Sequence, residues 1–358
     1  MLYLSGMASH ITDTDDDSDS PWFAWDEAED VVSPSLKGQS GRNWIDPWLN
    51  AARTPDVAAA LVEAAEQQAK LAARLTYDQR IAGAAVRLAY QETADAMWLA
   101  GDAGARDRLA LYAHGLRPAV DTRDLLADWA LRQLQGTGDP SRMTVPQLRS
   151  FLGLVSQKDS APAKWTEDQV ELFGRPMGDE LDLALSEWLA CASQVAGQHR
   201  LVRAVILHRA WRWLGLGAVE DPVSSVVVAC RIAAEKDTSF APLSGAVRQL
   251  RTFARGGSEA VRLIAMLNAF SEAARAALLA VERQALWNQR AADAAETKAE
   301  HAIVRALGTQ PMVSSKAVAH QSAMTPQAIN GAARSLLARD LISEMTGQSR
   351  FRLWQAAF

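Results

Sequence analysis

The feature that most constrains the fold of this chain is a stretch from Glu259 to Leu307 that contains neither glycine nor proline. Because these two residues most often interrupt or end a helix, the stretch predicts one long helix or two helices that abut. Between Ile264 and Val281, apolar residues recur at three- and four-residue spacing. That spacing places them on one helix face, which predicts a core contact or a dimer seam, and we favour the core.

The chain repeats this helical pattern from about Pro55 onward. Ala and Leu are abundant, whereas alternating Val, Ile and Thr are scarce, and this composition favours helices over strands. We predict helices at residues 56–75, 76–100, 105–115, 122–135, 144–155, 166–173, 179–197, 199–214, 222–234 and 242–255. The predicted fold class is mainly α, with a multi-helix domain over residues 43–295.

An acidic segment precedes this domain. The first 30 residues hold nine Asp and Glu side chains and no Lys or Arg. This composition, together with nearby prolines and glycines, predicts a disordered tail over residues 1–42. The rest of the chain carries 37 basic and 33 acidic residues, so it is mildly basic and compatible with a nucleic-acid partner.

Cysteine usage and hydropathy predict a cytoplasmic protein. Cys191 and Cys230 lie far apart in apolar stretches and lack CxxC spacing, which is typical of buried thiols in a reducing compartment. No basic region precedes the short apolar start, so we expect no secretory signal. The apolar stretch Leu201–Val219 contains three arginines and a histidine, and we therefore expect no membrane partner.

The last sixty or so residues, 296–358, follow a different pattern. We predict helices at 298–307 and 314–321, and a third helix that begins at Pro326 with Thr325 as its N-cap. After Asp340, two short strand-like runs at 341–345 and 350–354 are joined by a hairpin turn at 346–349. This order predicts a winged helix-turn-helix with a small β-hairpin wing.

Polar side chains on this module predict a DNA-contact surface. On the third helix, Gln327, Asn330 and Arg334 fall opposite the apolar face, and these residue types read base edges in the major groove. The predicted wing would place its arginines on the phosphate backbone. We assign DNA contact to Ser315, Lys316, Thr325, Gln327, Asn330, Arg334, Arg350 and Arg352.

These residues lead us to predict a DNA-binding transcriptional regulator. We expect double-stranded DNA as its partner, a homodimer as one option for the helical domain, and no cofactor. Residues 298–358 hold seven basic and three acidic side chains, which is consistent with a DNA partner. The alternative reading of the same module is contact with proteins only.

Three sequence runs carry a resemblance to a known family. They are Pro311-Met-Val-Ser-Ser-Lys-Ala-Val-Ala, Met324-Thr-Pro-Gln-Ala and Leu341-Ile-Ser-Glu-Met-Thr-Gly-Gln-Ser-Arg-Phe-Arg-Leu-Trp. They resemble the C-terminal helix-turn-helix of a bacterial, often plasmid-borne family that pairs it with a helical domain of unknown function. The module is also similar to the winged helix at the end of many Fic-domain proteins. The resemblance implies a DNA-binding protein whose helical domain is distantly Fic-like.

The residues that Fic catalysis needs are missing from the sequence. A Fic enzyme carries the motif His-Pro-Phe…Gly-Asn-Gly-Arg, in which the histidine is the base and the loop holds nucleotide phosphates. The nearest candidates are His199 or His208 with Gly215–Gly217, and they lack the Pro-Phe, the Asn and the Arg. The sequence also has no P-loop, GxSxG or HExxH motif. We predict that the chain is not an enzyme. A diverged Fic-like nucleotidyl-transferring enzyme and a non-catalytic protein-interaction module are the alternatives.

Overall fold

The computed structural model describes residues 44–78, 81–113, 122–153, 176–217, 222–255, 257–345 and 352–358. Four predictions lie outside these residues: the acidic tail over 1–42, the helix over 166–173, the turn at 346–349 and the contact residue Arg350.

The stretch without glycine or proline forms two helices. Helix α12 spans Glu259–Ala294, and α13 spans Lys298–Thr309. A capping box separates them, in which the Thr297 hydroxyl accepts from the backbone N–H of Glu300 and the Glu300 carboxylate accepts from the backbone N–H of Thr297. This exchange satisfies two N–H groups at the start of α13, and it thereby stabilises a new helix start.

Helices packed around one large core form the body of the protein. They are α1 (Ile45–Ala51), α2 (Pro55–Tyr77), α3 (Ala84–Leu99), α4 (Ala105–Ala113), α5 (Thr122–Gln135), the 3-10 helix η5 (Pro140–Arg142), α6 (Val145–Phe151), α8 (Gly178–Gln194), α9 (Arg200–Trp213), α10 (Val223–Ile232) and α11 (Val247–Ala254). The predicted mainly helical fold is confirmed. The helix predicted over 76–100 begins only at Ala84, because Gly83 adopts a positive φ of 84° that a helix cannot contain.

The centre of the body is mostly apolar. All residues of α10 are buried, and Trp188 and Trp211 meet edge to face with ring centroids 5.2 Å apart. The apolar face of α12 also faces this core, with Leu267, Phe270 and Val281 buried. The predicted apolar stripe of α12 is therefore used for core packing.

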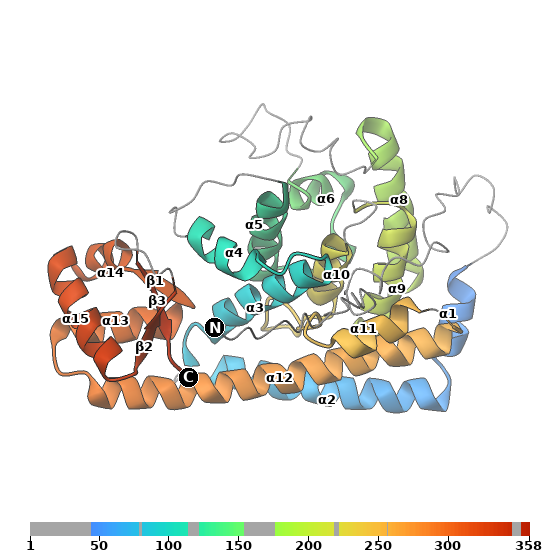
Figure 1. Ribbon diagram of the computed structural model, residues 1–358. Helices are drawn as coiled ribbons and strands as arrows, with labels where there is room; N and C mark the ends of the chain where they lie inside the picture. Colours follow the sequence, from blue (N-terminus) through green and yellow to red (C-terminus); the bar gives the residue numbers. More distant parts are fainter. Residues whose placement is uncertain are drawn as a thin grey trace, which may run out of the picture.

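Helix α12 runs along the lower edge of the molecule beside α2, from the C-terminal module to α11 (Figure 1). Within the described part of the chain, it is the one helix that is long and apolar enough to cross a membrane by length and composition. More than half of its most apolar window is buried inside the protein, and it packs against α2 and α11. Those contacts are typical of a core helix, and the cytoplasmic location stays a prediction.

The C-terminal module follows α13 and contains a small sheet. Its elements are β1 (Met312–Ser314), α14 (Ser315–Ser322), α15 (Pro326–Ala338), β2 (Ile342–Glu344) and β3 (Leu353–Ala356). The strands are antiparallel in the order β1-β3-β2. The module has a core of its own, which includes Ile303, Val318, Ile329, Leu336 and Trp354. The prediction missed β1, because three residues are too few to show an alternating pattern.

The module sits at one end of α12, next to the start of α3 (Figure 1). Two side chains of the body hold the end of α13: Arg87 donates to the carbonyl of Leu307, and Gln284 Nε2 donates to the carbonyl of Gly308 at 2.9 Å. Gly83 lies against Thr309 so closely that a Cβ atom there would be 2.2 Å from the Thr309 Cα. These three contacts place the sheet beside α3.

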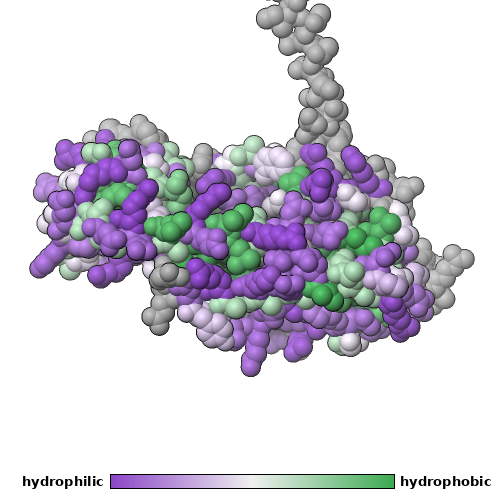
Figure 2. Space-filling model, turned by 90° about the horizontal axis from the view of Figure 1, so that it is seen from below, coloured by the Kyte–Doolittle hydropathy of each residue, from purple (hydrophilic) through white to green (hydrophobic). Residues whose placement is uncertain are grey.

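The underside of the protein is mostly hydrophilic, with small separate apolar patches (Figure 2). Large apolar side chains are exposed on both of the long helices, Val62 and Tyr77 on α2 and Leu279 and Leu286 on α12. Scattered residues of this kind are normal on a globular protein.

Candidate functional site

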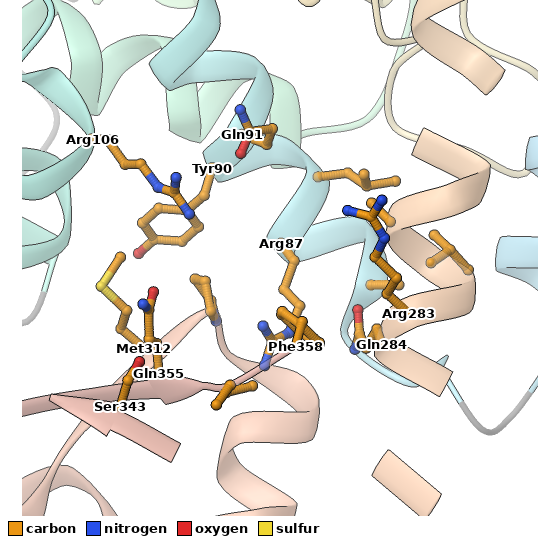
Figure 3. Close-up of a pocket in the computed structure, with 17 residues that line it drawn as sticks. Arg87, Tyr90, Gln91, Arg106, Arg283, Gln284, Met312, Ser343, Gln355 and Phe358 are labelled. Atoms are coloured by element: carbon orange, nitrogen blue, oxygen red, sulfur yellow. The ribbon is translucent and has the colours of Figure 1, made fainter. Parts of the chain in front are cut away.

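A cavity of about 530 Å³ lies where the C-terminal module meets the body. Its walls come from α3 and α4, from α12, and from the small sheet (Figure 3). The volume is within the range of small-molecule sites, which often form at junctions between domains.

The body side of the cavity is built from two helix faces. On α3, Ala84, Arg87, Leu88 and Gln91 line the cavity. They are spaced by three or four residues, so they share one face of the helix. Ala280, Val281, Arg283 and Gln284 of α12 form the adjoining wall.

The module side is one face of the sheet. Met312, Gln355 and Ser343 are register partners across the three strands, and all three line the cavity. Because side chains alternate across a pleated sheet, the neighbouring Val313 and Trp354 point the other way, into the core of the module. The sheet therefore separates the module core from the cavity.

Arg87 lies at the centre of the cavity wall and points toward Phe358 (Figure 3). Its guanidinium carbon is 5.4 Å from the centroid of the Phe358 ring, and its Nη2 donates to Leu307. Its Nε is buried and has no hydrogen-bond partner among the described residues. Burial lowers the pKa of Arg87 to about 10, so the side chain still carries its charge at neutral pH. An atom without solvent contact does not face the cavity, so Arg87 contributes its positive charge to the lining rather than a hydrogen bond from Nε.

Two more arginines line the cavity and are exposed to solvent. Arg106 lies on α4 and Arg283 lies on α12. Neither forms an ion pair with a residue of the described ranges. Those ranges contribute three arginines and no Asp or Glu to the lining. The lining side chains therefore carry a net positive charge, which suits a ligand that carries a negative charge.

Asp95 is a carboxyl group close enough to Arg106 for their charges to interact. Gln91 Nε2 donates to Asp95 Oδ1 at 2.6 Å. Burial and the neighbouring Glu92 raise the pKa of Asp95 to about 7, while Arg106 acts in the opposite direction. Below that pH, Asp95 is largely neutral and competes little with an anion for Arg106.

Tyr90 adds a hydroxyl donor to the same wall. Burial, and to a lesser extent the charge of Asp128, raises the pKa of Tyr90 to about 12. The phenol is therefore protonated at neutral pH, and it can donate a hydrogen bond to an anionic oxygen.

The residues predicted to contact DNA lie elsewhere on the module, and none of them lines the cavity. Arg350 lies outside the described residues. Ser315 and Arg352 are half-buried, and the exposed ones are Lys316, Thr325, Gln327, Asn330 and Arg334.

Several of these side chains have partners within the module. The Ser315 hydroxyl donates to Asn330 Oδ1 at 2.6 Å, and Arg352 Nε lies 3.5 Å from Glu344 Oε1. Thr325 caps α15 by accepting from the backbone N–H of Ala328, as predicted. The structure thus gives Ser315 and Thr325 local roles, and the contact role assigned to the set stays a prediction.

The histidines considered for Fic-type catalysis do not line this cavity. His208 is fully buried, its ring meets Phe253 edge to face at 5.4 Å, and its Nε2 lies 3.2 Å from the Ser225 hydroxyl. Burial holds the pKa of His208 well below its usual value. His199 caps α9, its Nδ1 accepting from the backbone N–H of Leu201. Both rings have structural roles.

The sequence interpretation missed the cavity residues. Arg87 and Gln91 are polar positions on the otherwise apolar face of α3, and that break in the apolar pattern is the one local signal for the cavity. The α12 and sheet residues show no comparable signal, because their significance depends on contacts with distant segments.

No family model matches this chain, and no curated protein is similar to it in sequence. A structural similarity was found to the crystal structure of a Fic family protein from Desulfovibrio desulfuricans G20. The identity is 12%, the TM-score is 0.47, and the match covers 85% of this chain and 96% of the other. This is consistent with the distant Fic-like resemblance of the sequence.

The predicted main function needs correction at this point. The similar structure belongs to a Fic family protein rather than to a DNA-binding regulator, so our prediction of a transcriptional regulator is contradicted.

Proposed function

We propose that this chain is a non-catalytic binding protein that holds a small anion in the cavity between its helical body and its C-terminal module. The observation that carries the proposal is the lining itself, in which Arg87, Arg106 and Arg283 are contributed by three helices. Arginine binds carboxylate and phosphate oxygens through several N–H donors at once. The module contributes the facing wall, with Ser343 and Gln355 as polar side chains of its sheet.

We also propose that the module is of the winged-helix type. Its element order is helix, strand, helix, helix and two strands, and its β3 lies between β1 and β2. In this arrangement the sheet packs one face on the three helices and leaves the other face free to line the cavity. The module thereby acts as one wall of the binding site.

The absence of catalysis is part of the proposal. A general base must reach the proton that it removes, and a nucleotide-transferring enzyme needs such a base beside its substrate. His208 is buried in the core and His199 caps a helix, so neither is placed for that role. The cavity lining in the described residues contains no histidine or carboxylate side chain.

Inorganic phosphate tests the anion site directly. We expect the thermal midpoint of the full chain to rise with phosphate concentration at constant ionic strength, because a ligand that binds only the native state stabilises it. Arg87→Met should weaken phosphate binding about 10- to 100-fold, the range for a hydrogen bond to a charged group. Calorimetric titration measures the dissociation constant.

Variants of the exposed arginines separate binding from folding. Arg106→Ala and Arg283→Ala are expected to weaken phosphate binding while leaving the circular dichroism spectrum unchanged. Arg334→Ala, an exposed arginine on α15 outside the cavity, serves as the matched control and should bind like the wild type. Equal affinities for all four proteins would contradict the proposed site.

A labelling experiment tests the absence of catalysis. The purified chain is incubated with magnesium and ATP labelled on the α-phosphate, together with a cell extract as a source of acceptors. We expect no transfer of label to any protein. Label transfer that disappears in His208→Ala or His199→Ala would show that the chain is an enzyme.

A further inference from the structure

The cavity contains more than the arginines that attract an anion. Leu88, Val281, Met312 and Ala356 also line it, and each of them is at most 8% exposed. Arg106 and Arg283, in contrast, are exposed side chains at the edge of the cavity. The wall is therefore apolar in its depth and charged toward solvent, with Arg87 between the two regions.

The size of the cavity adds a second constraint. At the volume that a water molecule occupies in the liquid, 530 Å³ would hold roughly 18 waters. A lone phosphate or carboxylate bound to the arginines would leave much of this water against Leu88, Val281 and Met312. A ligand that displaces the water gains free energy in proportion to the apolar surface it covers.

We infer that the cavity takes an amphiphilic organic anion, with a phosphate or carboxylate group held by the arginines and a hydrocarbon portion in the apolar depth. This inference rests on the proposed anion site and specifies its ligand class. A purely apolar ligand would offer no negative charge to the three arginines of the lining. A purely inorganic anion would leave water in contact with the apolar wall. A molecule with both parts satisfies both regions.

A series of alkyl phosphates tests the inference on the full chain. Dissociation constants are measured by calorimetry for inorganic, methyl, butyl, hexyl and octyl phosphate, all below their micelle concentrations. We expect affinity to rise up to about fourfold for each added methylene, since burying one contributes about 0.8 kcal/mol. The rise should stop when the cavity is filled. Octanol should bind at least tenfold more weakly than octyl phosphate.

Two variants test where the hydrocarbon portion and the phosphate group of the ligand bind. Ala356→Phe places a ring in the buried apolar part of the lining, so it should weaken octyl phosphate and leave inorganic phosphate unchanged. Arg283→Ala should weaken every phosphate by the same factor and preserve the dependence on chain length. Arg334→Ala should change neither.

The outcomes separate this inference from the proposed function. If all phosphates bind with one affinity, the apolar part is wrong and the anion site stands. If none of them binds, both are wrong. If octanol binds as tightly as octyl phosphate, the cavity is an apolar site and the anion proposal fails.

Discussion

Gly83→Ala is expected to detach the C-terminal module from the body and abolish anion binding. Gly83 has a φ of 84°, where an L-residue is strained by about 1–2 kcal/mol. An added Cβ would also lie 2.2 Å from the Thr309 Cα and 2.5 Å from the Thr309 carbonyl oxygen. These are backbone atoms, so they cannot rotate away, and the end of α13 must move from the start of α3.

Hydrogen–deuterium exchange measures that displacement. Peptides covering residues 84–91 and 305–314 should lose protection in Gly83→Ala, whereas peptides from the buried α9 should exchange as in the wild type. Calorimetry on the same variant should show no heat of phosphate binding, since two walls of the cavity separate.

Gly331→Ala provides the matched control. Gly331 lies within α15, and a Cβ there would meet no atom within 4 Å. Replacing a helical glycine by alanine stabilises a helix by up to about 1 kcal/mol. We therefore expect unchanged exchange and unchanged phosphate binding. Wild-type protection in Gly83→Ala would mean that the contact between Gly83 and Thr309 does not hold the two parts together.

Glu92→Leu is expected to cost about 3 kcal/mol or more of the free energy of unfolding. The Glu92 carboxylate is buried and accepts hydrogen bonds from the backbone N–H groups of Leu243 and Ser244, the Ser244 hydroxyl and the Cys230 thiol, at 2.6 to 3.3 Å. Leucine would leave these donors without an acceptor. Each lost partner of a buried polar group costs about 1–3 kcal/mol.

The loss is large compared with a total stability of about 5–15 kcal/mol for a domain. Urea denaturation should show a lower midpoint with little change in slope. Glu92→Gln keeps one acceptor oxygen and should lose less than Glu92→Leu. Burial raises the pKa of the Glu92 carboxyl, so the core favours its neutral form, which an amide resembles.

Glu63→Leu is the control, because it makes the same Glu-to-Leu substitution as Glu92→Leu but at the surface. Glu63 lies on α2, and its exposed carboxylate pairs with the exposed Arg275. Exposed ion pairs contribute about 0–1 kcal/mol, so this variant should unfold near the wild-type midpoint. Similar midpoints for Glu92→Leu and Glu63→Leu would refute the structural role given to Glu92.

Much of the fold follows from local patterns. The cap at Thr325 was predicted, and the structure confirms that its hydroxyl accepts from the backbone N–H of Ala328, three residues on. The stretch without glycine or proline was compatible with one helix or with two. The structure shows two helices, because the capping box at Thr297 starts a new one. Such signals are readable because a helix forms from contacts three and four residues apart.

The functional prediction had a different outcome. The exposed polar residues of α15 suggested a DNA-binding regulator, and the structural comparison contradicts that function. The residues that form the candidate site received no role, although Arg87 and Gln91 stood among the apolar positions of α3. A polar residue on such a face can equally end in solvent, so its meaning depends on what packs against the helix.

The sequence by itself determined the helices, their caps and the change of pattern at the C-terminal module, because each depends on residues close together in the chain. Only the tertiary structure determined where the cavity lies and which residues line it. Arg87 and Leu307, whose contact places the module beside α3, are 220 residues apart. Bringing them together requires α12 to pack along the body and present the sheet to α3. No local sequence pattern predicts the contact between Arg87 and Leu307, because that contact depends on how the whole core packs.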